Sequence, residues 1–131
     1  MTREGKNGIL NIADKLEHVT SACEERKANE IIVLDVRELT LIADYFVICN
    51  GNSRVHIDAI VEHVVQTLKG LGDKTVRVEG SSSTGWVLID CGDILVNVFD
   101  PPQRDYYGLE RLWGDAEESE VISSPPEHSS S

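Results

Sequence analysis

Apolar and polar positions follow two different periods along the chain, and these periods predict its helices and strands. Apolar residues recur every three to four positions from Ile9 to Cys23, which places them on one helical face and predicts a first helix over residues 9–28. The same spacing follows the polar, cap-forming residues 50–53 and predicts a second helix over residues 54–69, which Gly70 ends. The chain therefore contains two amphipathic helices that each need an apolar partner.

Short, mostly β-branched apolar runs predict five strands, which lie over residues 31–34, 45–49, 75–79, 86–89 and 94–99. The first two strands are joined by a connection too short for a crossover helix, so we expect them to be antiparallel neighbours. The uniform apolar character of the first strand predicts that both of its faces are covered. The last two strands are joined by the tight turn at residues 90–93, which is typical of a hairpin. A mixed α/β fold follows, with a five-stranded sheet flanked by helices.

A short helix is expected to close the folded part. Asp100 followed by two prolines is a typical helix start. Tyr106, Leu109 and Trp113 then share one predicted face, while Tyr107 falls outside it and should point outward. Beyond Trp113 the sequence is rich in Glu, Ser and Pro without periodicity, as in a solvated tail. We therefore predict one domain over residues 1–113 and an acidic, disordered tail over residues 114–131.

Charge and length narrow the class of partner. The 131 residues carry a formal charge of −11, and residues 114–131 hold five acids and no base, so residues 1–113 still carry −6. Such a surface disfavours binding to bare nucleic acid and favours a basic protein. No apolar run is long enough to cross a membrane, and no secretory segment precedes the first helix. We expect a cytoplasmic protein that binds neither membranes nor specific nucleic acid sequences.

Residues able to carry chemistry are few, and each has a structural explanation. Asp90 and Asp93 could approach a metal ion, yet the hairpin turn accounts for both. Cys49 with His56 or His63 would be a thiolate and base, but a cysteine that ends an apolar strand usually packs as a small hydrophobe. The three cysteines are widely spaced and indicate neither a zinc site nor a disulfide framework. We expect no catalytic residue, no metal and no cofactor.

Several segments together resemble the ribosomal silencing factor family, also called RsfS or Iojap. They are residues 32–36 (IVLDV), 43–48 (ADYFVI), 78–80 (VEG), 86–90 (WVLID) with Gly92-Asp93, and above all the Y-x-L-E-x-L-W element at residues 107–113. The resemblance runs from about Ile9 to Gly114, and its last element is the most specific part.

The resemblance implies a nucleotidyltransferase-like sheet without the catalytic carboxylates, in a protein that is not an enzyme. It also implies a ribosomal silencing factor that binds the large ribosomal subunit through large-subunit protein fourteen. There it sterically blocks joining of the small subunit and represses translation when nutrients are limiting. A large-subunit assembly factor is the alternative that organelle relatives suggest. A metal-dependent nucleotidyltransferase, using Asp90 and Asp93, is the less favoured third hypothesis.

Position by position, the resemblance implies a docking surface formed by Trp86, Asp90, Cys91, Tyr107, Leu109, Glu110 and Trp113. We expect Trp86 and Tyr107 to supply apolar anchors, and Asp90 and Glu110 to pair with basic side chains of the ribosomal protein. Family members often form homodimers when free, so a homodimer is also expected.

Four positions depart from the family pattern. Asn97 stands where the family generally has histidine, and Asn50 and Asn52 replace the usual Thr or Ser around Gly51. Gly108 replaces a polar residue and lowers helix propensity by about 1 kcal/mol relative to alanine, so we expect it to loosen the last helix.

Overall fold

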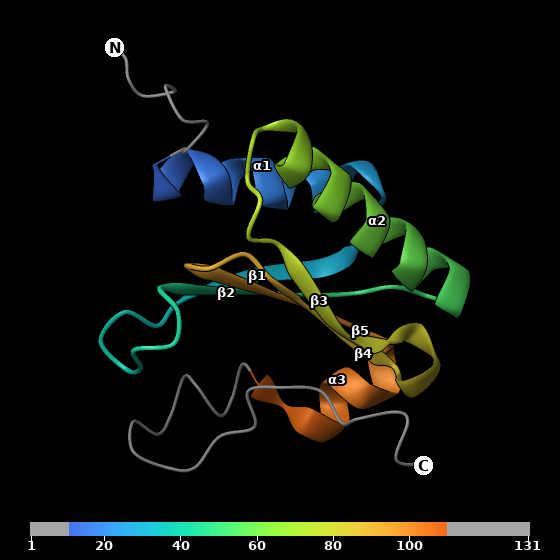
Figure 1. Cartoon of the computed structure of the whole chain (residues 1–131). Coiled ribbons are helices and arrows are strands. Elements are labelled where there is room, and N and C mark those ends of the chain that lie inside the picture. The colour runs from blue at the N-terminus through green and yellow to red at the C-terminus, as the bar shows by residue number, and fades with distance from the viewer. Residues whose placement is uncertain (1–10, 110–131) are drawn as a thin grey trace.

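A mixed five-stranded sheet lies between two helices on one face and a single short helix on the other (Figure 1). The coordinates are a computed structural model, which describes residues 11–109. The helices within these residues are α1 (Ile12–Glu25), α2 (Arg54–Gly70) and α3 (Pro101–Tyr107), together with the 3₁₀ turn η2 (Ser82–Thr84). The strands are β1 (Asn29–Asp35), β2 (Tyr45–Asn50), β3 (Arg77–Ser81), β4 (Trp86–Asp90) and β5 (Ile94–Phe99). The predicted fold class is confirmed.

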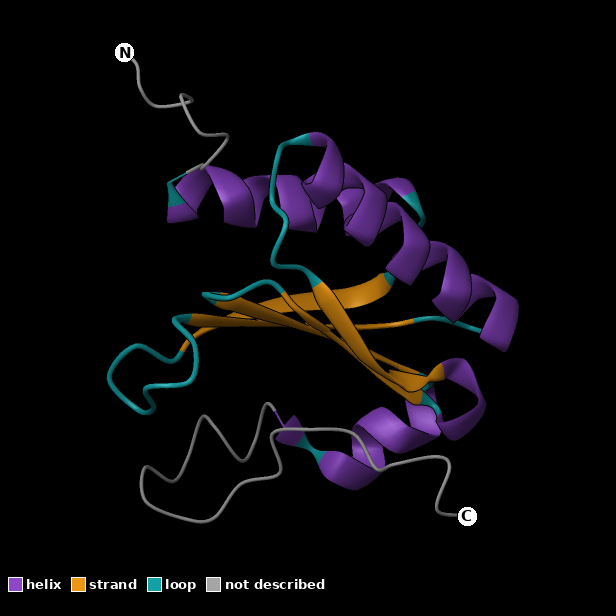
Figure 2. Cartoon of the chain, viewed as in Figure 1, coloured by secondary structure: helices purple, strands orange, loops and turns teal. Residues whose placement is uncertain are grey.

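The strand order is β1-β2-β5-β4-β3, which places β2 and β5 at the centre of the sheet. These two central strands are parallel, and every other neighbouring pair is antiparallel. The predicted antiparallel pairing of β1 with β2 and the predicted β4–β5 hairpin are both confirmed. Figure 2 shows how the sheet separates the two helical layers.

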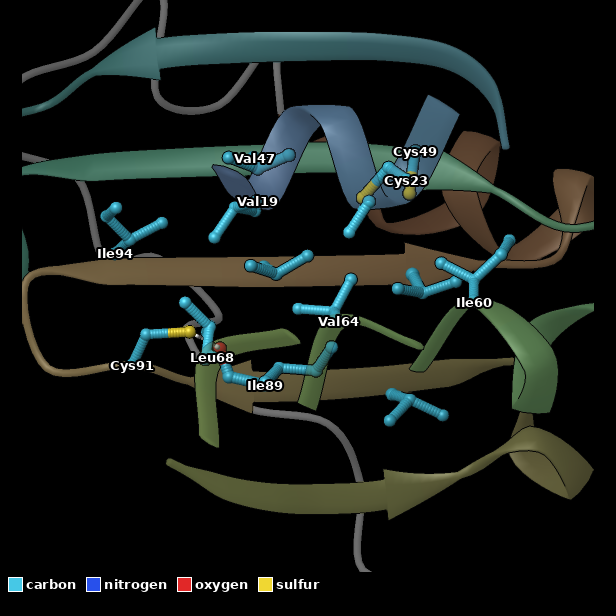
Figure 3. Close-up of a cluster of buried hydrophobic side chains, with 14 of the residues drawn as sticks. Val19, Cys23, Val47, Cys49, Ile60, Val64, Leu68, Ile89, Cys91 and Ile94 are labelled. Carbon is cyan, nitrogen blue, oxygen red and sulfur yellow. Dashed lines mark hydrogen bonds between the residues drawn. The ribbon is translucent and has the colours of Figure 1, made fainter. Parts of the chain in front are cut away.

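Two apolar clusters fill the space on either side of the sheet. The α1/α2 side includes Val19, Cys23, Ile60 and Val64, which pack onto β2, β4 and β5 (Figure 3). The α3 side contains Phe46, Ile48, Trp86, Phe99 and Leu109. Because β2, β4 and β5 are covered on both faces, their side chains are apolar almost without interruption.

The first predicted strand is not buried on both faces, because it is an edge strand. Within residues 11–109, β1 pairs with β2 alone. Half-buried and exposed residues mix along it, and Val33 is 41% exposed. The third strand begins at Arg77 instead of Thr75. The carboxylate of Asp73 accepts hydrogen bonds from both the backbone N–H and the hydroxyl of Thr75, at 2.9 and 2.7 Å, and this local turn holds Thr75 out of the sheet.

The helix ends also differ from the predicted ranges. The side chain of Asn11 caps α1 by accepting a hydrogen bond from the N–H of Asp14 at 2.8 Å, so the helix begins at Ile12. It ends at Glu25, before Lys27 takes a positive φ of 60°.

None of the helices within residues 11–109 is long and apolar enough to cross a membrane. The predicted tail at residues 114–131 lies outside the described residues.

Candidate docking surface

Trp86 lies in the core, not on the surface. Its side chain is 0% exposed, and its ring centroid lies 5.0 Å from that of Phe99 and 4.5 Å from that of Tyr107. The indole Nε1–H donates a hydrogen bond to Oδ1 of Asn97 at 2.9 Å, so its polar atom has a buried partner. The expectation that Trp86 is a surface anchor is therefore wrong. Because Trp86 lies beneath α3, it supports Tyr107, which packs on its ring.

The two tyrosines of α3 exchange their predicted roles. Tyr106 was expected on the buried face but is 76% exposed, whereas Tyr107 is half-buried and packs on Trp86 and Phe99. Arg104 and Tyr107, three residues apart on α3, face the sheet, and this leaves Tyr106 on the outer side. Gly108 then adopts a left-handed φ of 56° and ends α3 after Tyr107. The helical spacing from Tyr106 to Leu109 consequently does not continue. Gly108 ends the helix instead of loosening it.

Leu109 and Cys91 are also buried, at 1% and 0% exposure, so neither side chain is available as a surface contact. The other two predicted docking residues, Glu110 and Trp113, lie outside the described residues. Burial raises the pKa of the Cys91 thiol to about 12, so it is not a thiolate at neutral pH.

Asp90 is the predicted acidic residue that does reach the surface, with 22% of its side chain exposed. Its Oδ2 forms an ion pair with Arg77 at 2.8 Å, and its Oδ1 accepts a hydrogen bond from the N–H of Gly92 at 2.9 Å. The backbone carbonyl of Asp93 accepts hydrogen bonds from the N–H groups of Asp44 and Tyr45, at 2.8 and 3.2 Å. The turn thus uses the carboxylate of Asp90, while the backbone of Asp93 attaches the hairpin to the start of β2. Residues 11–109 contain no cluster of three or more potential metal ligands among His, Cys, Asp and Glu.

Cys49, His56 and His63 do not form a thiolate and base. Cys49 is fully buried and lies beside Cys23 (Figure 3). A hydrogen bond with Cys23, together with burial, holds the pKa of Cys49 well above its usual range.

Both histidines tie α2 to the end of α1. His63 Nε2 lies 2.6 Å from Oε1 of Glu25. His56 Nδ1 accepts from the N–H of Asn52 at 2.8 Å, so Nε2 must carry the proton that it donates to the carbonyl of Arg26, also at 2.8 Å.

Sequence reasoning missed Arg104, a charged residue that is only 6% exposed. One guanidinium nitrogen donates to Oδ1 of Asn50 at 2.8 Å and to the carbonyl of Glu30 at 2.7 Å, which attaches α3 to the ends of β1 and β2. No local signal indicated its burial, because the predicted apolar face runs through Tyr106 and Leu109, whereas the structure places Arg104 on the sheet side of α3 with Tyr107. Arg104 and Asn50 also line a polar cleft of about 540 Å³.

Two predicted docking residues, Asp90 and Tyr107, keep partly exposed side chains, and each contacts an exposed neighbour, Arg77 or Tyr106. We call these four residues the candidate docking surface. Alternate residues of a strand share a face, so Asp90 lies on the same side of the sheet as Trp86, on which Tyr107 packs. Fold and surface together define a mixed α/β domain with an aromatic and charged face suited to docking on another macromolecule.

Comparison with known proteins identifies the family. The family model described as "Ribosomal silencing factor during starvation" matches residues 10–131. The chain is 39% identical over 107 residues to the ribosomal silencing factor of Bacillus subtilis, covering 82% of this chain and 91% of that protein. The crystal structure of a Chromobacterium violaceum protein superposes with a TM-score of 0.77 at 34% identity, covering 88% of this chain and 96% of the other. The chain belongs to the ribosomal silencing factor family, and the resemblance noted from its sequence is confirmed.

An organelle relative is also similar. The mouse protein named "Mitochondrial assembly of ribosomal large subunit protein 1" is 32% identical over 101 residues, which cover 75% of this chain and 44% of that protein.

Proposed function

We propose that this protein binds the large ribosomal subunit through large-subunit protein fourteen and blocks joining of the small subunit. It would thereby repress translation in the cytoplasm when nutrients are limiting. The observation that carries this proposal is membership of the ribosomal silencing factor family, with 39% identity to the Bacillus subtilis factor over most of both chains.

To block subunit joining, the protein needs only to bind the large subunit. A stable interface takes about 800 Å² from each partner, which one face of a domain this size supplies. A bound domain at the subunit junction excludes the other subunit by its volume, so no chemical step and no cofactor are required. Asp90 and the overall charge of −11 favour a basic protein surface. Tyr106 offers an exposed aromatic side chain that stacks edge-on against Tyr107 at 4.9 Å, with Trp86 beneath.

A titration with purified large subunits tests the proposal. We expect the wild type to bind and to slow subunit joining, and Tyr106→Ala and Asp90→Asn to bind about tenfold more weakly. Asp90→Asn keeps the oxygen that accepts from Gly92 but removes the charge. Asp58→Asn makes the same charge change at an exposed position of α2, on the other side of the sheet, and should bind like the wild type. Absence of binding by the wild type would contradict the proposed function.

A large-subunit assembly factor is the second candidate, and the name of the mouse relative favours it. A strain that lacks the protein would then accumulate large-subunit precursors while mature subunits join normally. The silencing function predicts the opposite pattern, with normal precursors and faster joining in starved cells. The nucleotidyltransferase hypothesis has less support, because residues 11–109 contain no group of three or more His, Cys, Asp or Glu side chains placed to hold a metal ion.

We also propose that the free protein forms a homodimer, as the resemblance implies. Sedimentation of the purified protein over a range of concentrations measures this directly, and a monomer at every concentration would contradict it.

A further inference from the structure

The loop between β1 and β2 displays two aliphatic side chains to solvent. Leu41 is 102% exposed and Ile42 is 50% exposed. Six large hydrophobic residues are exposed within residues 11–109, and these are the only two that are adjacent in sequence. Adjacent exposed aliphatic residues form a patch, and such patches mark interaction sites more often than single exposed residues do.

Buried residues and hydrogen bonds hold this loop in place. Val36 and Ala43, at its two ends, are 0% and 5% exposed and pack into the core on the α3 side. The N–H of Val36 donates to the carbonyl of Asp44 at 2.9 Å, and the N–H of Ile42 donates to Oγ1 of Thr40 at 3.2 Å. A loop fixed at both ends loses little entropy on binding, so its exposed side chains are preorganised for a partner.

Charges beside the loop indicate what kind of partner fits. Residues 35–44 contain three acids, Asp35, Glu38 and Asp44, and one base, Arg37. A recess of about 410 Å³ at the base of the loop is lined by Asp35, Arg37, Glu38 and Leu39. Asp35 and Arg37 form an ion pair at 2.6 Å, so Glu38 gives the recess its net negative charge. A complementary surface would offer an apolar hollow for Leu41 and a neighbouring Lys or Arg side chain for the recess.

The loop that carries Leu41 and Ile42 lies at the same end of the molecule as Asp90. The N–H groups of Asp44 and Tyr45 donate to the backbone carbonyl of Asp93, at 2.8 and 3.2 Å, which attaches the end of the loop to the β4–β5 hairpin. Asp90 lies in that hairpin and begins its turn. A partner that reaches Asp90 from this end can therefore also meet the loop.

We propose that Leu41 and Ile42 form a second docking contact, which inserts into an apolar hollow flanked by basic side chains on a protein of the large ribosomal subunit. This inference rests on the proposed function, because the same partner must hold Asp90 and the Leu41–Ile42 loop.

The test compares Leu41→Ser/Ile42→Ser with Val55→Ser in the large-subunit titration. Val55 is 79% exposed on α2, so its substitution is a matched control for loss of an exposed aliphatic side chain. We expect the double variant to bind at least about tenfold more weakly and Val55→Ser to bind like the wild type, with all three unfolding at similar temperatures. If the double variant binds as tightly as the wild type, the inference is overturned while the proposed function stands. If the wild type itself does not bind, the proposed function fails.

Photocrosslinking identifies the molecule that the loop contacts on the large subunit. A photoreactive p-benzoylphenylalanine introduced at position 41 should form an adduct with a ribosomal protein that resists ribonuclease. Adducts only with ribosomal RNA, or only with a second copy of this chain, would overturn the inference.

Discussion

The hydrogen bond from Trp86 to Asn97 offers a quantitative test of how the docking surface is supported. Both side chains are buried, at 0% and 1% exposure, and the Nε1 to Oδ1 distance is 2.9 Å. The amide nitrogen of Asn97 faces the carbonyl of Leu95 at 3.5 Å, which turns the amide oxygen toward the indole. Asn97→Leu replaces the amide with an apolar side chain of similar size and leaves the indole N–H without its acceptor.

The expected cost comes from that buried donor. An unsatisfied buried polar group lowers the free energy of unfolding by about 1–3 kcal/mol. For a domain of about 100 residues, each kcal/mol lost lowers the melting temperature by about 4–8 °C. Trp86→Phe removes the donor instead, leaves the amide oxygen of Asn97 unpaired and creates a small cavity. Each single variant should therefore be clearly less stable than the wild type.

Urea unfolding of the two single variants and the double variant completes a thermodynamic cycle. We expect the double variant to be more stable than the sum of the two effects predicts, by about 1 kcal/mol, because it removes both polar groups together. Asn52 is an exposed asparagine that accepts a side-chain hydrogen bond from Asn29 at 2.8 Å, and Asn52→Leu is the control, with a change within about 0.5 kcal/mol. Wild-type stability in Asn97→Leu, or strict additivity in the cycle, would refute the reasoning.

Three further predictions follow from individual contacts. Gly85→Ala should lower the free energy of unfolding by about 1–3 kcal/mol in urea, because φ is +81° and a Cβ would lie 2.6 Å from Oδ2 of Asp100. Thiol reagents at pH 8 should label Cys91 only after unfolding, since burial raises its pKa to about 12; labelling of the native protein would contradict this. Burial alone would raise the pKa of Asp73, but hydrogen bonds from Lys15 and Thr75 outweigh it and hold this pKa below the ordinary 3.8. This carboxylate therefore stabilises the fold above that pH, and thermal melts should show the stabilisation fading as the pH falls further, to a smaller extent in Asp73→Asn.

Much of the fold was predictable because it depends on local patterns. The apolar period placed α2 over residues 54–69 against the observed Arg54–Gly70, and the β-branched run at residues 94–99 matches β5. Short connections also predicted two of the antiparallel pairs, β1 with β2 and β4 with β5. The limits of β3 were less predictable, because the turn between Asp73 and Thr75 competes with the sheet through side-chain hydrogen bonds.

The candidate site was less predictable than the fold. Trp86 and Leu109 were expected at the surface, yet both are buried under or beside α3. Their exposure depends on how a seven-residue helix packs against the sheet, which no local pattern specifies. Arg104 escaped notice for the same reason, since its acceptors belong to Asn50 and Glu30, far away in the sequence.

The sequence by itself determined the fold class, the pairing of β1 with β2 and of β4 with β5, and the family, because helical and strand periods and short motifs are local properties. Tertiary structure alone decided which members of a motif face the solvent. The packing of α3 places Tyr107 on Trp86, so the neighbouring Tyr106 points outward. The loop that displays Leu41 is likewise held by Val36 and Ala43 in the core. The exposure of a side chain depends on the whole tertiary structure, because elements distant in the sequence either cover it or leave it open to solvent.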